Sequence, residues 1–395
     1  MLQLVPGDST KVLILGSDGY LGWPLTLRLL ARGHEVSGMD NLFTRRAVAE
    51  VGSTSGVPIL GPEGRVRAAK ELLGSSPTFY RGDVTNYKAL EKVISKERPD
   101  AVVHFAEQRS APYSMIDERH AAYTMSNNIV GTINLIYAVM KSGRDTQVVK
   151  MGTMGEFGTP NFDIPEAAWV DTKINGKMDT ITVPKWAGSW YHWTKVHDTN
   201  NLLFANRLWG ITSTDIMQGP VYGLRTTDIT DPRLFTRFDF DGDWGTVLNR
   251  YCVEAVLGMP LTVHGKGGQV RGFLSLEDSM EALRLLLENP PEPGGYRPVN
   301  QFRELYSVAE LADFVKDVGG RMGLDVKITN IKNPRVEKEQ HHYKVESKVL
   351  PSLGFNRLKK NIKDEIRLIL EDLAPYKSRL GRYRKAIMPR TLWKK

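Results

Sequence analysis

Tyr191 and Lys195 are a pair of residues whose types and spacing suit proton transfer. Four positions separate them, so on a helix they share one face and the ammonium group lies close to the phenol. A phenol with a pKa of about 10 is a poor base at neutral pH, but a neighbouring cation favours the phenolate and lowers that pKa. We therefore expect Tyr191 to take a proton from a hydroxyl group while a cofactor takes a hydride. The motif alone is common, and its meaning depends on whether a dinucleotide site precedes it.

A glycine-rich turn near the start of the chain is typical of such a site. The apolar run 11–16 suits a buried parallel strand, and it leads into Gly16-x-x-Gly19-x-x-Gly22 and an amphipathic helix at 24–32. Glycines let the backbone approach a pyrophosphate, and the helix points its N-terminus at the anion. The spacing differs slightly from the usual Gly-x-Gly-x-x-Gly, but the strand before it and the helix after it fit a dinucleotide site.

Acidic residues in the next two strands indicate which dinucleotide binds. The second strand ends in Asp40, where a carboxylate accepts hydrogen bonds from the adenosine ribose 2′-hydroxyl and favours NAD over NADP. Arg45 and Arg46 follow closely and are placed to reach a 2′-phosphate instead, which leaves NADP as an alternative. The third strand, at 78–84, places Asp83 near the adenine amino group.

Strands and helices alternate through the first half of the chain. Further strands are predicted at 101–106 and 147–152, with a helix around 128–140 between them. This alternation predicts an α/β fold with right-handed crossovers and a doubly wound parallel sheet, whose ligands bind at the carboxyl ends of the strands. Thr153 and the helix of Tyr191 come at or after that edge.

Beyond residue 218 the pattern becomes irregular and predicts a smaller C-terminal α/β part that caps the sheet edge. We expect a polar, acidic loop at 226–243, two strands around a glycine turn at 261–271 and a helix at 276–288. Residues 51–77, rich in glycine, serine and proline, are interpreted as a surface insertion. The expected division is a dinucleotide-binding domain at 10–224, a substrate domain at 225–380 interleaved with the first, and a basic tail at 381–395.

The formal net charge of +8 arises at the end of the chain. Eight basic residues and no acidic one lie between Tyr376 and Lys395, which leaves residues 1–375 formally neutral. A tail of this kind is usually solvated, and a neutral body argues against a nucleic-acid partner.

Composition predicts a cytoplasmic protein without membrane insertion. The apolar fraction of 41% is ordinary, and no apolar run approaches the roughly 18 residues that span a bilayer. The start of the chain lacks the features of a signal peptide. The single cysteine, Cys252, excludes an intrachain disulfide and fits a reducing compartment. No metal site is expected, because His341-His342 has no ligand spacing around it.

Together, the glycine turn and the Tyr191-x-x-x-Lys195 pair resemble the extended short-chain dehydrogenases/reductases that act on nucleotide sugars. Longer stretches resemble a narrower group within them, the UDP-sulfoquinovose synthase family. These stretches are FAEQRSAPYSMID at 105–117, GTMGEFGTPN at 152–161, YHWTKVHD at 191–198, GKGGQVRG at 265–272, NPRVE at 333–337 and IMP at 387–389. The resemblance covers nearly the whole chain from Lys11 onward.

The resemblance implies a bound NAD and the conversion of UDP-glucose and sulfite to UDP-sulfoquinovose, with a sulfite-delivering protein as a further partner that it allows. It implies Thr153, Tyr191 and Lys195 as the oxidoreductase triad, with Asn127 or Asn128 supporting Lys195. The implied cofactor-binding residues are Gly16, Asp18, Gly19, Tyr20, Leu21, Gly22, Asp40, Asn41, Arg45, Arg46, Asp83, Val84, Ala106, Asn127, Asn128, Tyr191, Lys195 and Val221. The implied substrate-binding residues are Arg109, Thr153, Gln218, Arg271 and Arg335. Ala106 departs from the pattern, because a glycine is expected there near the pyrophosphate.

The chemistry that these residues permit begins with oxidation at C4 of the glucose, with Tyr191 as base and Thr153 as hydroxyl donor. The resulting 4-ketone acidifies the C5 proton, so water can leave across C5–C6, sulfite can add at C6, and hydride return restores the C4 alcohol. Related dehydratases carry an acid where this chain has Met154, so Glu156 and His192 remain the two candidates for the C5 base. Arg109 either attracts sulfite or pairs with a structural acid.

Two rival functions share parts of this site. A UDP-glucose 4-epimerase or 4,6-dehydratase shares the oxidation step and is disfavoured by Met154 and by the stretch from Glu107 to Arg109. A non-catalytic scaffold that binds NAD is disfavoured by the intact triad. The helices at 128–140 and 191–206 are apolar around much of their girth, which predicts a homodimer paired through them.

Overall fold

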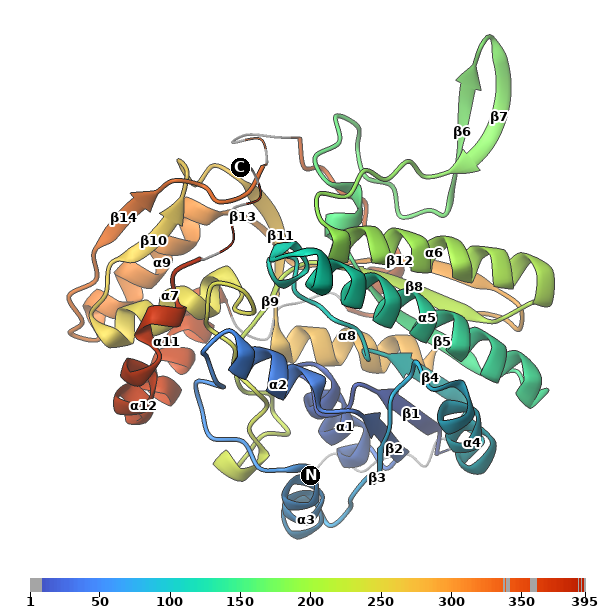
Figure 1. Ribbon diagram of the computed structural model, residues 1–395, viewed down its shortest axis with the longest axis horizontal. Helices are drawn as coiled ribbons and strands as arrows, with labels where there is room; N and C mark the ends of the chain where they lie inside the picture. Colours follow the sequence, from blue (N-terminus) through green and yellow to red (C-terminus); the bar gives the residue numbers. More distant parts are fainter. Residues whose placement is uncertain are drawn as a thin grey trace.

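A sheet of seven parallel strands forms the centre of the molecule (Figure 1). The computed structural model describes residues 9–336, 338, 342–355, 361–389, 391 and 393. The strands follow the order β12-β8-β5-β4-β1-β2-β3, and all neighbouring pairs are parallel. Their bounds are β1 (Lys11–Leu15), β2 (Glu35–Asp40), β3 (Thr78–Arg81), β4 (Ala101–His104), β5 (Gln147–Thr153), β8 (Ser213–Gln218) and β12 (Tyr296–Gln301). The predicted doubly wound parallel sheet is confirmed.

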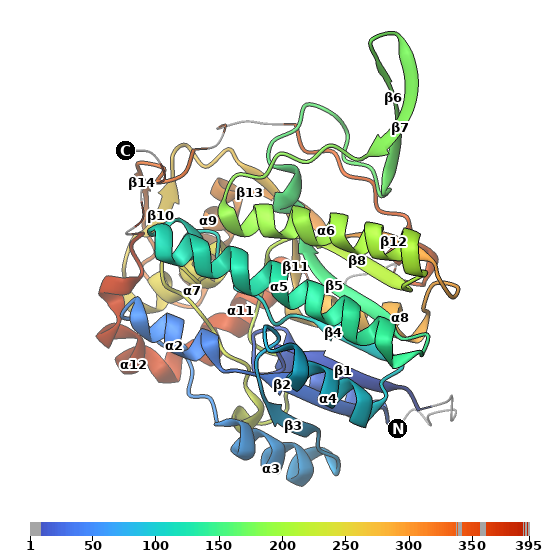
Figure 2. The same cartoon turned by 45° about the vertical axis from the view of Figure 1, so that its right-hand side comes forward.

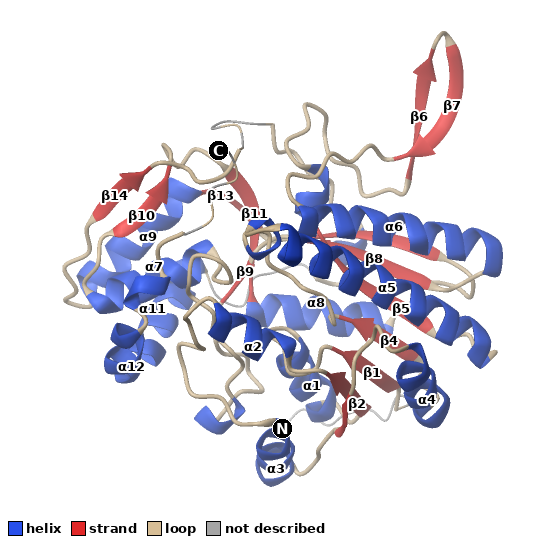
Figure 3. Ribbon diagram, viewed as in Figure 1, coloured by secondary structure: helices blue, strands red, loops and turns tan. Residues whose placement is uncertain are grey.

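Helices cover both faces of the sheet (Figure 3). One face carries α4 (Tyr87–Glu97), α5 (Glu118–Ser142) and α6 (Trp190–Trp209), and the other carries α1 (Gly22–Ala31) and α8 (Leu276–Glu288). Strand β1 shows the cause, because Val12 and Ile14 belong to the core on the α1 side while Leu13 and Leu15 belong to the core on the α5 side. A strand that is apolar on both faces requires a helical layer on each.

A smaller α/β part lies against the carboxyl ends of β5 and β8. Its elements are β9 (Val221–Tyr222), α7 (Val247–Leu257), β10 (Leu261–His264), β11 (Val270–Ser275), β13 (Glu304–Ser307), α9 (Val308–Arg321), β14 (Ile328–Ile331), α10 (Val349–Ser352), α11 (Ile362–Leu373) and α12 (Lys377–Arg382). Because β12 returns to the edge of the central sheet, the segments that make up the two parts alternate along the chain.

A hairpin of β6 (Trp169–Ile174) and β7 (Lys177–Thr182) stands away from the rest of the fold in two views (Figure 1, Figure 2). It lies in the segment between β5 and α6, for which the sequence predicted no element. In the same views α5 and α6 run side by side across one face. No helix of the described residues is long and apolar enough to cross a membrane.

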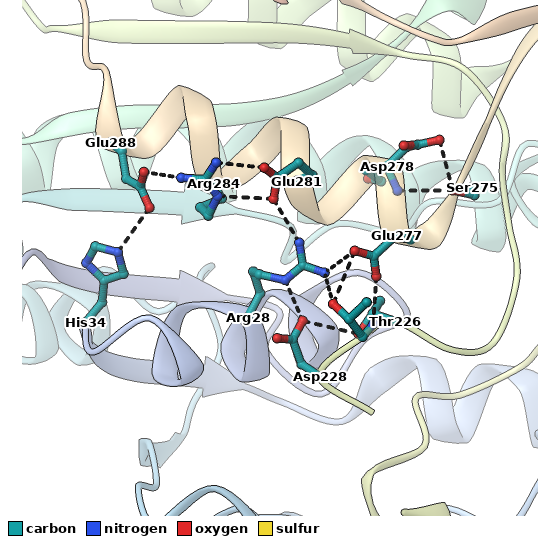
Figure 4. Close-up of polar contacts among 12 residues, drawn as sticks. Arg28, His34, Thr226, Asp228, Ser275, Glu277, Asp278, Glu281, Arg284 and Glu288 are labelled. Carbon is teal, nitrogen blue, oxygen red and sulfur yellow. Dashed lines mark hydrogen bonds and ion pairs between the residues drawn. The ribbon is translucent and has the colours of Figure 1, made fainter. Parts of the chain in front are cut away.

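A buried arginine joins α1 to the second half of the chain (Figure 4). The Arg28 guanidinium is fully buried and donates to Asp228 at 2.5 Å, Glu277 at 2.8 Å and Glu281 at 3.0 Å. Burial acts to lower the pKa of this guanidinium, but the Asp228 and Glu277 carboxylates outweigh it and hold the pKa above its ordinary value. The cluster fixes α1, which begins at the glycine turn, against α8.

Residues 51–77 are not the simple surface insertion that the sequence predicted. They contain α3 (Pro62–Leu73), and Val57 is fully buried. The Arg65 guanidinium is also buried, donates to Asp18 at 2.7 Å and lies 5.0 Å from the Trp23 ring centroid. Composition suggested a loop at 51–77, whereas the segment packs against the glycine-turn region and contributes to the core.

The structure adds to two expectations for the second half and corrects a third. The segment 226–243 is mostly loop, as predicted, but it is largely buried, with Phe238 and Phe240 inaccessible to solvent. The two strands predicted at 261–271 are present as β10 and β11, but they do not pair with each other, because β10 pairs with β14 and β11 pairs with β13 and β9. The basic tail is not simply solvated, since Leu380 and Ile387 are fully buried. In each case a partner far along the chain decides the outcome.

Candidate active site

A cavity of about 340 Å³ opens where the smaller part meets the carboxyl ends of β1, β5 and β8. This is the edge at which doubly wound sheets bind ligands, and the volume is typical of a small-molecule site. Thr153, Tyr191, His192 and Lys195 line the cavity. The predicted substrate residues Arg109, Gln218, Arg271 and Arg335 also line it.

The glycine turn forms one end of the cavity and requires its glycines. Gly16 has a φ of +84°, and a Cβ there would lie 2.6 Å from the carbonyl carbon of Phe105. A Cβ on Gly22 would lie 2.1 Å from the Gly16 oxygen. The turn can therefore present its backbone to a ligand with no side chain between, as a pyrophosphate site needs. Tyr20, Leu21 and Val221 line the same cavity beside it.

A second, smaller pocket adjoins the turn. Seven of the predicted cofactor residues line it, namely Gly16, Gly19, Asp40, Asn41, Val84, Ala106 and Asn127. The Asp40 carboxylate accepts from the backbone N–H of Asp18 at 2.9 Å and of Leu42 at 2.6 Å. Burial and the neighbouring Asp18 raise the pKa of Asp40 to about 6. A carboxylate at the end of β2 with unused lone pairs fits an adenosine ribose.

The structure places the remaining predicted residues of this region beside the pocket. The Asp18 carboxylate accepts from Arg45 Nε at 2.6 Å and from Arg65 Nη1 at 2.7 Å. Arg45 is therefore held by Asp18 and is not aimed at a 2′-phosphate. Arg46 donates to the Asn41 carbonyl at 2.8 Å, and Asn41 donates to Asp83 at 2.8 Å, so Asp83 orients the loop that follows β2.

Lys195 lies near Tyr191, as their spacing predicts, with its ammonium 5.8 Å from the Tyr191 ring centroid. The ammonium forms a buried ion pair with Glu107 and donates to the Met151 carbonyl at 2.5 Å. The expectation that Lys195 lowers the pKa of Tyr191 is wrong for this arrangement. Withdrawal of the phenol from water, followed by the Glu107 carboxylate, raises its pKa above the ordinary value.

Neither predicted asparagine contacts Lys195 directly. Asn128 donates to the Gln108 carbonyl at 3.0 Å and to Thr194 Oγ1 at 2.9 Å. It thereby ties the loop after β4 to the turn of α6 that carries Lys195. Asn127 lies in the smaller pocket and donates to the Asn128 side chain at 3.0 Å.

Glu156 belongs to a buried ionic cluster beneath the cavity. Its carboxylate accepts from Lys185 Nζ at 2.5 Å and from Lys150 Nζ at 3.2 Å, and Asp215 pairs with Lys150 at 3.0 Å. It also accepts from the Thr153 backbone N–H at 3.2 Å, which closes a capping box around the short 3₁₀ helix η2 (Met154–Phe157). Glu156 is fully buried and is not part of the cavity wall that Thr153 lines.

His192 lies in the cavity wall. Its Nδ1 is 2.9 Å from Ser189 Oγ, the hydroxyl that caps α6. Withdrawal from water and the nearby Arg335 and Arg271 guanidiniums lower its pKa to about 3, so the imidazole is neutral at physiological pH. A Cβ on Gly155 would lie 2.4 Å from His192 Nε2, so the glycine makes room for this ring. The neighbouring Met154 is buried in an apolar cluster with Phe157.

Arg109 pairs with a structural acid, which is one of the two alternatives that the sequence left open. It lines the cavity while forming an ion pair with the buried Asp239, and its guanidinium lies 5.5 Å from the Trp244 ring centroid. Gln218 donates to Ser279 Oγ at 2.9 Å and to Gln301 at 2.8 Å, which fixes its amide at the cavity floor.

Several functional candidates were missed from the sequence. Arg250, His264 and Gln269 line the cavity, and both polar atoms of the Gln269 amide are buried without a hydrogen-bond partner. Gln269 lies within the GKGGQVRG stretch at 265–272, whereas no short motif marks Arg250 or His264. Lys150 had a recognisable signal, since a lysine interrupts the apolar run that forms β5. Among the described residues no group of three or more His, Cys, Asp or Glu side chains could hold a metal ion, and His341 lies outside those residues.

The fold is α/β, and it places a glycine turn suited to a dinucleotide beside a cavity that Tyr191 lines. A model of the NAD dependent epimerase/dehydratase family matches residues 12–300, and the chain belongs to this family.

The chain is similar over its whole length to two related proteins. The UDP-sulfoquinovose synthase of Sulfolobus acidocaldarius is 58% identical over 98% of this chain and 98% of its own. The chloroplastic UDP-sulfoquinovose synthase of Spinacia oleracea is 42% identical over 98% of this chain and 79% of its own. A solved UDP-glucose 4-epimerase from Stenotrophomonas maltophila with bound NAD has a TM-score of 0.73 at 17% identity, over 94% of this chain and 99% of that one. At that identity the structural match supports the fold alone.

Proposed function

We propose that this protein is a UDP-sulfoquinovose synthase, which uses NAD to convert UDP-glucose and sulfite to UDP-sulfoquinovose. The observation that carries the proposal is the 58% identity over 98% of both chains to the Sulfolobus acidocaldarius enzyme of that name. The cavity supports it, because the side chains for oxidation and those for binding a sugar nucleotide face one space.

When bound, NAD would supply the hydride acceptor for the oxidation at C4 and, in its reduced form, the hydride donor for the closing reduction. The glycine turn would hold its pyrophosphate, and Asp40 would accept from its adenosine ribose. Tyr191 would take the C4 hydroxyl proton and later return it, and Thr153 would donate to the same oxygen. The positive charge of a bound nicotinamide would favour the phenolate that burial and Glu107 disfavour in the protein without ligand. Glu107 and the Met151 carbonyl hold the Lys195 ammonium near the Tyr191 ring, where it would help to position the phenol.

We assign His192, rather than Glu156, as the base for the C5 proton. His192 lines the cavity beside Tyr191, with their ring centroids 5.0 Å apart, whereas Glu156 is committed to two lysines. Loss of the C5 proton and of the C6 hydroxyl as water gives an enone, to which the sulfite sulfur adds at C6 while a proton returns to C5. A neutral imidazole is able to take that proton and give it back, and a diphosphate bound by Arg271 and Arg335 would offset the charges that hold its pKa down.

Arg271 and Arg335 suit a diphosphate, because a guanidinium donates two parallel hydrogen bonds. Arg109 adds positive charge on the side of the cavity where sulfite would enter, although Asp239 partly offsets it. We further propose that residues 10–224 with β12 hold the cofactor and residues 225–380 hold the UDP-sugar, and that sulfite is a free substrate or is delivered by a partner protein.

We also propose a homodimer paired through α5 and α6. Apolar side chains on their outer faces are exposed in one chain, including Tyr137 at 41%, Phe204 at 59% and Leu208 at 53%. Pairing through a second copy would cover these faces in a four-helix contact.

The test is incubation of the purified protein with UDP-glucose, with and without sulfite, followed by mass spectrometry of the sugar nucleotide. We expect a sulfonated product only when sulfite is present. UDP-galactose formed without sulfite would instead identify a 4-epimerase, and a stable 4-keto-6-deoxy sugar would identify a 4,6-dehydratase. Either outcome without sulfonation contradicts the proposal.

A further inference from the structure

The end of the chain packs against one wall of the substrate cavity. Ile387, which follows the short 3₁₀ helix η5 (Arg384–Ala386), is fully buried. The Gly242 backbone N–H donates to the Ala386 carbonyl at 2.9 Å, and a Cβ on Gly242 would lie 2.8 Å from Pro389 Cα. Because Gly242 also lines the cavity, this part of the chain directly supports the wall.

Four residues further on, the chain contacts a different wall. The Trp393 backbone N–H donates to the Pro334 carbonyl at 3.0 Å. Its indole centroid lies 5.3 Å from the guanidinium of Arg335, within the range of a cation–π contact. Arg335 lines the cavity together with Arg271 and His192. After burial, the charges of these two arginines lower the pKa of His192.

From these contacts we infer that Trp393 is a positioning residue for Arg335. Trp393 thereby sets the affinity of the site for the UDP-sugar. An arginine side chain loses considerable rotamer freedom when it binds a ligand. An indole already lying over the guanidinium restricts that freedom beforehand, so less of it is lost when a diphosphate binds. The inference rests on the proposed function only for the identity of the ligand.

The experiment measures UDP binding to the full-length protein by titration calorimetry. Trp393→Ala should weaken UDP binding about fivefold, as expected for loss of one partly exposed cation–π contact. Trp393→Phe, which keeps a ring, should recover most of the affinity. With UDP-glucose as substrate, KM should rise for Trp393→Ala while kcat and NAD retention stay within about twofold of wild type, since the hydride site is untouched.

Two further variants separate positioning from general structure. Trp186→Ala removes a tryptophan that is 79% exposed and does not line the cavity, and it should bind UDP like wild type. In an Arg335→Ala background, Trp393→Ala should cause no further loss, because Trp393 acts through that arginine.

The inference is overturned if Trp393→Ala binds UDP within twofold of wild type, or if the losses of the two single variants add in full. Binding and sulfonation are measured separately. A protein that binds UDP but forms no sulfonated product contradicts the proposed function, and the role of Trp393 is then still decided by the binding data.

Discussion

Replacing Glu156 by glutamine distinguishes a structural carboxylate from a catalytic base. The side chain is fully buried and accepts from Lys185 at 2.5 Å, Lys150 at 3.2 Å and Thr199 at 3.1 Å. Glutamine keeps the shape but removes the charge, so Lys150 retains its ion pair with Asp215 while Lys185 loses its ion pair with Glu156. Removing one partner of a buried ion pair costs about 3–5 kcal/mol. That is a large part of the roughly 5–15 kcal/mol that stabilises a folded protein.

The measurement is urea unfolding of wild type and variant. If the dependence of the unfolding free energy on urea concentration is unchanged, the shift in the midpoint concentration gives the change in stability. Glu310→Gln is a matched control, because Glu310 closes the same kind of capping box, with Ser307, at an exposed position. Glutamine serves equally well in a capping box, so this control should lose less than about 0.5 kcal/mol. The difference between the two variants isolates the cost of the buried ion pairs.

Activity at a temperature where the variant is folded completes the test. We expect kcat of Glu156→Gln to stay within about tenfold of wild type, whereas loss of a general base costs about 10²–10⁴. His192→Gln should show the opposite pattern, with wild-type stability and no sulfonated product. A Glu156→Gln protein as stable as wild type but inactive would falsify the assignment of His192 as the C5 base.

Three further predictions concern the cofactor, the phenol and the assembly. Tyr191→Phe should reduce turnover by about 10³ or more while NAD stays bound, as measured in the supernatant of denatured protein; near-normal turnover would contradict its role. Because the pKa of Asp40 is raised to about 6, the protein should bind NAD severalfold more weakly at pH 5 than at pH 7.5. Asp40→Asn should remove that pH dependence in a fluorescence titration, and an unchanged pH profile argues against the ribose contact. By light scattering, wild type should have the mass of two chains and Phe204→Glu the mass of one. A wild-type protein with the mass of one chain would contradict the proposed homodimer.

The raised pKa of Asp40 also predicts how the stability of the folded protein changes with pH. Folding raises the pKa of Asp40 from 3.8 to about 6, so protonation stabilises the folded state. This contribution is complete below pH 3.8 and is lost as the pH rises through 6. Without NAD, Asp40→Asn should therefore be more stable than wild type at pH 7.5 and nearly equal to it at pH 4, as measured by urea unfolding.

The sequence alone predicted five of the seven strands of the central sheet, β1 to β5, and the turn at Gly16. Apolar runs ending in glycine or an acid, each followed by a helix, are local patterns, and they predicted β1, β2 and the turn at Gly16. The spacing of Tyr191 and Lys195 is likewise local, because a helix places residues four apart on one face. These features depend on neighbouring residues and were therefore visible in one sequence.

Our proposal of His192 rather than Glu156 as the C5 base depends on the tertiary structure alone. Both follow predicted elements, but the partners of Glu156 lie on β5, on α6 and in the loop before α6, and no spacing rule brings them together. Burial of the phenol, followed by the charge of Glu107, reversed the expected shift in the pKa of Tyr191 for the same reason. The end of the chain shows the effect most clearly. Its composition indicated a solvated tail, whereas contacts with Gly242 and Arg335, far away in the sequence, pack it behind the cavity wall.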